Sequence, residues 1–203
     1  MSFFVAIHQE AWPDRLDTLL GTIRQNLAAA ATLHPGRRAA RLFQRFGQPT
    51  HLLGLSEWVD EQSFEQLRQS PEFHQLNDTC GMPPRIETLE PLRRFERMEQ
   101  RVAIASCVRI VAPPVYDRDV QEFLLSHAHH GVKSMSGLVS REVYRVRHRP
   151  GEFLALRSWT SLADLERFRA GEGTGFDATL IQLGATVERF TGALAAELSL
   201  LHR

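Results

Sequence analysis

The densest group of residues that could bind a metal is a histidine cluster in the second half of the chain. It reads His127-Ala-His-His130, and His127 and His130 lie one helical turn apart, a spacing that can chelate a metal ion. No carboxylate or cysteine stands at ligand spacing, since Asp119 and Glu122 lie a turn or more away. The alternative is a histidine patch near the end of a helix, where the dipole favours positive charge. We therefore predict no metal site. If a metal is bound, His127 and His130 are the candidate ligands.

Three polar side chains of the first half could hydrogen-bond a ligand. His8 lies in a segment of alternating polarity, while His74 and Asn77 are spaced i, i+3 and would share one face of a helix. Two aromatic residues, Trp58 and Phe73, accompany them. The alternative interpretation is that Trp58 is a core or rim packing residue and His74 a surface residue.

The elements that must position these residues occur twice along the chain. Val5-Ala-Ile7 recurs as Val102-Ala-Ile104, and Trp58 recurs as Trp159 at a slightly larger offset, which indicates a short insertion between the two matches. Each half shows the order β-α-β-β-α-β. In the first half we expect strands near 3–10, 39–46, 51–58 and 86–92, with helices at about 14–27, 61–70 and 73–79.

The second half is predicted to repeat this order. We expect strands near 102–110, 138–148 and 153–159, and helices that begin near residues 117 and 162. A further helical spacing runs from Phe176 through Val187 and Phe190 to Gly192. The tail at 193–201 alternates and is predicted to be a strand, although a continued helix also fits its leucine spacing.

The order β-α-β-β-α-β is the ferredoxin-like arrangement, with both helices on one face of an antiparallel sheet. The other face of each sheet would be bare and apolar, and would need a partner. We therefore predict an α+β fold of two ferredoxin-like units in tandem, 1–98 and 99–203, that form an intramolecular α+β barrel. Such a chain would be a monomer with an internal pseudo-dimer, or a homodimer.

The segment around the first tryptophan resembles a known family. It reads Leu55-Ser-Glu-Trp58-Val-Asp-Glu-Gln-Ser-Phe64 and continues to Ser70-Pro71-Glu-Phe73. This is similar to the antibiotic biosynthesis monooxygenase (ABM) domain of the dimeric α+β barrel superfamily. The resemblance covers nearly all of 3–98, and 101–201 more weakly, because Ser70-Pro71 becomes Gly173-Thr174 in the second half.

The resemblance implies a cofactor-independent oxygenase that acts on a phenolic or quinol small molecule. Such an enzyme needs a dry pocket, hydrogen bonds that hold the phenolate, and a base. It implies His8, His74 and Asn77 as catalytic candidates and Trp58 and Phe73 as substrate-binding candidates, with no bound cofactor.

Two alternatives come from other classes of function. The first alternative is a non-catalytic small-molecule-binding or structural protein, in which one or both halves have lost their catalytic residues. A haem- or metal-binding barrel protein would use His127 or His130. Haem-degrading relatives use an Asn, a Trp and a His, and the matching positions of the first half fall near His8, on Leu67 and on Asn77, so this triad is missing.

Composition excludes several other functions. Lys+Arg and Asp+Glu are both 24, so the formal net charge is zero, which argues against nucleic-acid or membrane binding through bulk positive charge. Lys133 is the single lysine, which leaves no other residue for Schiff-base chemistry. Cys80 and Cys107 form no CxxC pattern, and we find no signal peptide or apolar span. We expect a cytoplasmic protein whose partner is a small aromatic molecule.

Overall fold

The structure is a computed structural model that describes residues 2–97, 100–129, 135–171 and 175–199, without the side chains of residues 31, 128, 129 and 199. The chain divides into two compact units. Unit 1 comprises Met1–Leu89 together with Ala193–Arg203, and unit 2 comprises Glu90–Gly192.

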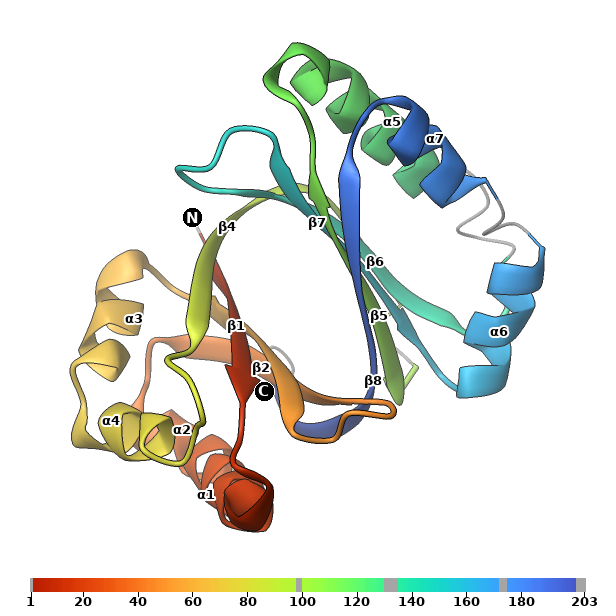
Figure 1. Ribbon diagram of the computed structural model, residues 1–203. Coiled ribbons are helices and arrows are strands. Elements are labelled where there is room, and N and C mark those ends of the chain that lie inside the picture. Colours follow the sequence, from red (N-terminus) through yellow and green to blue (C-terminus); the bar gives the residue numbers. More distant parts are fainter. Residues whose placement is uncertain (1, 98–99, 130–134, 172–174, 200–203) are drawn as a thin grey trace. The chain divides into compact units, whose positions relative to one another are not determined.

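Unit 1 contains the predicted β-α-β-β-α-β order (Figure 1). Its elements are β1 (Phe3–Glu10), α1 (Leu16–Ala28), α2 (Ala30–Leu33), β2 (Arg37–Arg45), β3 (His51–Trp58), α3 (Glu61–Arg68), α4 (Pro71–Asn77) and the first part of β4 (Arg85–Glu96). Strand β3 pairs antiparallel with both β1 and β2, and β1 also pairs antiparallel with β4. The helices α1 to α4 cover one face of these strands.

Unit 2 repeats this order. Its elements are β5 (Ile104–Val111), α5 (Asp117–His129), β6 (Leu138–Val146), β7 (Glu152–Trp159), α6 (Leu162–Ala170), α7 (Phe176–Gln182) and the first part of β8 (Thr186–Ser199). Strand β7 pairs antiparallel with β5 and β6. The predicted fold of two ferredoxin-like units in tandem is therefore confirmed.

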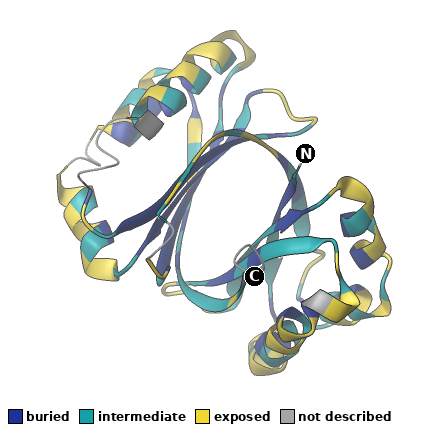
Figure 2. Cartoon of the chain, turned by 180° about the vertical axis from the view of Figure 1, so that it is seen from behind, coloured by how far each residue is buried: buried dark blue, intermediate teal, exposed yellow. Residues whose placement is uncertain are grey.

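Side-chain caps and apolar faces explain why the helices form where they do. Ser70 begins α4 by accepting a hydrogen bond from the Phe73 amide at 3.2 Å, and Ser161 begins α6 by accepting one from the Asp164 amide at the same distance. In Figure 2 the helices are exposed on their outer surface and carry buried positions toward the strands. Burial of that apolar face stabilises helices that would be too short to persist alone.

Strand register corrects the predicted alignment of the two halves. Phe3 lies opposite Trp58, and Ile104 lies opposite Trp159, so β1 corresponds to β5 beginning at Ile104 rather than at Val102. The counterpart of His8 is therefore Arg109. The predicted alignment was wrong because a register shift by an even number of residues leaves the same side chains on each face of a strand. A match of only three residues cannot distinguish the two registers.

The helix predicted to continue to Gly192 ends at Gln182, and Val187 and Phe190 belong to β8. Gly184 adopts φ 71°, and its amide donates a hydrogen bond to the Ile181 carbonyl. A left-handed glycine at this place ends a helix, which the apolar spacing alone did not reveal. The predicted tail strand is confirmed as far as Ser199, and residues 200 and 201 lie outside the described residues.

In the described part of the chain, no helix combines the length and the apolar character that crossing a membrane requires.

Candidate active site

An aromatic cluster joins the helices of unit 1 to its sheet. Its members lie on β1, β3, α3 and α4 and are Phe3, Val5, Trp58, Phe64, Leu67 and Phe73. Trp58 is 0% exposed, and its Nε1 donates a hydrogen bond to the Ser56 hydroxyl at 2.9 Å. Its ring meets the Phe64 ring edge-on, with centroids 5.6 Å apart. Trp58 is thus a core residue with its polar nitrogen satisfied.

A cavity of about 90 Å³ lies beside this cluster, between the sheet and the helices of unit 1. Most of its wall is apolar and comes from the residues Ile7, Ile23, Leu27, Ala40, Leu42, Gly54, Leu55, Leu67, Phe73 and Leu76. The polar or charged lining residues are Gln9, Asn26, His34, Arg37, Arg41 and Ser56. Apolar walls with a few polar groups are typical of a small-molecule site.

Small residues of β2 and β3 leave this space open. Ala40 lies opposite Ser56 in the register of the two strands, and Gly54 lies opposite Leu42. A Cβ atom built on Gly54 would find no heavy atom nearer than 3.8 Å, the distance to the Ile7 carbonyl oxygen. The cavity therefore depends on short side chains in its floor rather than on a displaced helix.

Arg37 is a half-buried basic residue in the lining of this cavity. Its guanidinium carbon lies 4.6 Å from the centre of the Trp58 ring, a cation–π geometry. The Nε atom is buried and has no hydrogen-bond partner among the described residues. Burial lowers the pKa of Arg37 to about 10, so the group remains a cation at neutral pH.

His34 borders the same cavity just before β2. Its Nε2 atom is buried and, within the described ranges, lacks a hydrogen-bond partner. Burial lowers the pKa of His34 and Arg37 adds to this effect, while Glu72 opposes both. The ring is therefore neutral at pH 7 and can donate or accept one hydrogen bond at the cavity. The sequence analysis did not single out His34, because no motif or spacing marks it as a site residue.

The predicted site residues lie in different places. Phe73 lines the cavity. Trp58 does not line it, but contacts two residues that do, Ser56 and Arg37. The residues described around the cavity do not include His8, His74 or Asn77. His74 is exposed on α4, whereas the Asn77 Oδ1 atom is buried without a hydrogen-bond partner among the described residues.

His8 belongs to the sheet face opposite the helices. Ile7, the residue before it, packs against the aromatic cluster on the helix side, so the alternation of β1 directs His8 away from the cavity. The His8 Nε2 atom lies 3.4 Å from a carboxylate oxygen of Glu87, which is fully buried. A catalytic role for His8, His74 or Asn77 remains a prediction.

Of the two metal candidates, only His127 is among the described residues. Its ring packs against Phe123, with centroids 4.2 Å apart, and against Phe176 at 5.6 Å. His130 lies outside the described residues. Over the residues with described placement, no group of three or more histidine, cysteine or carboxylate side chains could hold a metal ion.

The position of the cavity within the chain agrees with a family comparison. Residues 2–79 match the antibiotic biosynthesis monooxygenase (ABM) family. The predicted resemblance of the first half is thus confirmed. The ABM match runs from β1 to the end of α4, and every residue that lines the cavity lies within it.

Solved structures share the whole fold at low sequence identity. A proposed monooxygenase from Lactobacillus acidophilus NCFM has a TM-score of 0.75 at 7% identity, covering 98% of this chain and 96% of that chain. A second proposed monooxygenase, from Fusobacterium nucleatum subsp. nucleatum, has a TM-score of 0.78 at 9% identity, with 98% and 94% covered. An anthrone oxidase-like protein has a TM-score of 0.73 at 12% identity, with 99% and 94% covered. No curated protein matches the sequence significantly.

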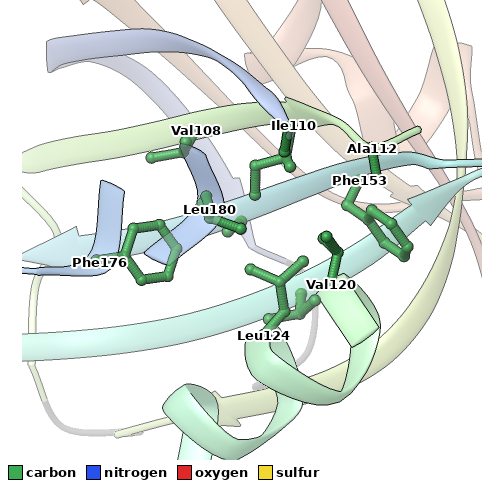
Figure 3. Packing of buried hydrophobic residues seen from close by; sticks show 11 residues of the cluster. Val108, Ile110, Ala112, Val120, Leu124, Phe153, Phe176 and Leu180 are labelled. Carbon is green, nitrogen blue, oxygen red and sulfur yellow. The ribbon is translucent and has the colours of Figure 1, made fainter. Parts of the chain in front are cut away.

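Unit 2 carries larger side chains at the positions that form the cavity floor in unit 1. From the registers with β3 and β7, the corresponding pairs are Ala40 and Arg141, Gly54 and Ala155, and Ser56 and Arg157. The Arg157 side chain is 4% exposed and lies over the rings of Phe168 and Phe176, at 5.0 and 4.8 Å. Figure 3 shows Phe176 and Leu180 of α7 packed with apolar side chains of the sheet and α5.

Proposed function

We propose that unit 1 is a cofactor-independent oxygenase whose cavity binds a phenolic or quinol small molecule. The observation that carries this proposal is that one apolar cavity lies entirely within the ABM match and is bordered by groups that can hydrogen-bond an oxygen substituent. Apolar walls exclude water, and neutral His34 can accept the proton of a ring hydroxyl.

The chemistry balances without a reductant. Once ionised, an electron-rich phenol can pass electrons to O₂. Conversion of one ring C–H and the hydroxyl into the two carbonyls of a quinone takes one oxygen atom from O₂ and releases the other as water. The protein would supply position, a dry site and a proton acceptor, which are the contributions expected where the substrate itself is the reductant.

Oxygen uptake tests the proposal. Purified protein is mixed with a panel of hydroquinones, naphthols and anthrones in air and, as a control, under nitrogen. We expect O₂ consumption matched by quinone formation, and a loss of at least tenfold in kcat/KM for His34→Gln. Gln75→Ala, an exposed change on α4, serves as the control variant. Binding of these compounds without any O₂ uptake would instead favour a non-catalytic binding protein.

The same assay tests the residues predicted from the sequence. We compare His8→Ala, His74→Ala and Asn77→Ala with His34→Gln. Turnover that survives in all three alanine variants and is lost in His34→Gln would remove those residues from the site. Loss in His8→Ala alone would place the reaction on the opposite sheet face and contradict the assignment to this cavity.

A further inference from the structure

The lining of the unit 1 cavity includes a cation, Arg37. Its Nε atom is buried without a hydrogen-bond partner among the described residues, and its guanidinium carbon lies over the Trp58 ring. A charge set in a largely apolar wall is costly unless it is paired, and a bound anion would offset that cost. Arg37 is therefore suited to bind an anionic ligand.

A carboxylate that interacts with His34 is already engaged. Glu72, at the start of α4, interacts with His34 rather than with Arg37. Hydrogen bonds from its own backbone amide and from Ser70 lower the pKa of Glu72. Glu72 thus serves the N-terminus of α4, where negative charge is favourable, and leaves Arg37 available.

We propose that the ligand of the unit 1 cavity is an aromatic anion whose oxyanion binds Arg37, with His34 as a second hydrogen-bond donor. This inference rests on the proposed function only because the anion site and the proposed oxygenase site are the same cavity. A guanidinium presents a planar fork of N–H donors that matches a carboxylate or a phenolate oxygen, while the apolar wall accepts the ring. Two buried nitrogens that lack a hydrogen-bond partner among the described residues, Arg37 Nε and His34 Nε2, belong to residues that line this one cavity.

The cavity volume limits the size of that ligand. About 90 Å³ is smaller than the roughly 150 Å³ of an engineered cavity that binds benzene. A single ring therefore enters only if flexible side chains such as Leu27 and Leu76 change rotamer. We expect one-ring anions to bind more readily than fused polycyclic ones.

Fluorine NMR titration tests this inference without any need for turnover. The probes are 4-fluorobenzoate, 4-fluorophenol and the neutral 4-fluorobenzyl alcohol. We expect 4-fluorobenzoate to bind at least tenfold more tightly than the alcohol, and Arg37→Met to abolish that preference. Arg37→Lys should restore part of it, because the charge returns without the planar fork. Arg68→Met, which removes an exposed positive charge from α3, should leave it unchanged.

Equal affinity of the alcohol, the acid and the phenol, or a preference that persists in Arg37→Met, would overturn the inference. Dependence on Arg37 shown by 4-fluorophenol alone would assign the oxyanion to a ring hydroxyl, and would support it. If Arg37→Met does not fold, the ratio of the affinities for 4-fluorobenzoate and the alcohol is measured for Arg37→Lys and His34→Gln. A ratio equal to that of the wild type in both variants would overturn the inference. An anion preference without O₂ uptake contradicts only the proposed oxygenase, whereas uptake with neutral-ligand preference contradicts only this inference.

Discussion

The two units share one order of elements and one buried tryptophan each, but they differ under their helices. In unit 1 the floor positions are Ala40, Gly54 and Ser56, and a cavity lies above them. In unit 2 the corresponding positions include Arg141 and Arg157, both 4% exposed. The comparison indicates that a few residues at fixed register positions decide how much space is left between the sheet and the helices of each unit, and the predictions below test that conclusion.

Filling the floor of unit 1 should have the largest effect. Gly54→Val extends a side chain into the open space above β3, so we expect oxygen uptake to fall at least tenfold, since even one methylene changes pocket selectivity by about 1–3 kcal/mol. The matched change Ala155→Val in unit 2 should leave uptake unchanged and destabilise the core by about 1–3 kcal/mol through overpacking. Steady-state kinetics and thermal unfolding measure the two effects. Equal loss of uptake in both variants would refute the difference between the units.

Removing the buried charge of unit 2 should increase stability. Burial lowers the pKa of Arg157 to about 9, with further lowering by Arg141 and Arg189. We expect Arg157→Met to raise the free energy of unfolding at pH 7 by about 1 kcal/mol or more, as apolar replacements of buried ionic groups do. Urea unfolding measures this, with the exposed Arg167→Met as control.

The pH dependence of that difference has a definite sign. Because the pKa of Arg157 is lower in the folded protein than in the unfolded chain, the unfolded chain binds more protons near and above pH 9. The stability of the wild type should therefore rise relative to Arg157→Met between pH 8 and pH 10 (roughly the range around the shifted value). A constant difference across this range would show that Arg157 is balanced by a partner.

Helix α4 of unit 1 has a side-chain cap that its counterpart α7 lacks. Ser70 accepts the Phe73 amide hydrogen bond, whereas Gly175 precedes α7 with φ 89° and no side-chain cap. Ser70→Ala should lower the free energy of unfolding by about 1 kcal/mol. Differential scanning calorimetry measures the change, and the exposed Gln75→Ala should leave it near zero. No loss for Ser70→Ala would mean that packing of Phe73 alone maintains α4.

The smallest expected effect compares two glycines. Gly21 lies inside α1, and a Cβ atom there would find nothing within 4 Å, so Gly21→Ala should stabilise unit 1 by about 0.5–1 kcal/mol. Gly175→Ala in unit 2 should destabilise, because φ 89° is unfavourable for a residue with a side chain. Chemical unfolding of both variants tests the opposite signs. The same sign for both would show that one of these glycines serves packing rather than backbone conformation.

Sequence reasoning located the elements better than the site. Alternation over 3–10 and the segment from Glu61 to Phe73, which is divided by Ser70-Pro71, predict β1, α3 and α4, because these signals are local. The end of α7 was predicted wrongly, since apolar spacing from Phe176 to Phe190 fits a helix and the left-handed Gly184 is invisible to that pattern. Histidine spacing favoured His74, which the structure places on an exposed surface.

By itself, the sequence determined the repeated β-α-β-β-α-β order, the neutral overall charge and the resemblance of the first unit to the ABM family, because periodicity, composition and short motifs are properties of neighbouring residues. Only the tertiary structure decided that Arg37 and His34 meet Phe73 and Gly54 at one cavity. Strand register and helix packing bring these positions together from separate segments, and the space they enclose depends on side-chain volumes in strands β1, β2 and β3 and helices α1, α3 and α4. A pattern along one segment contains no such information.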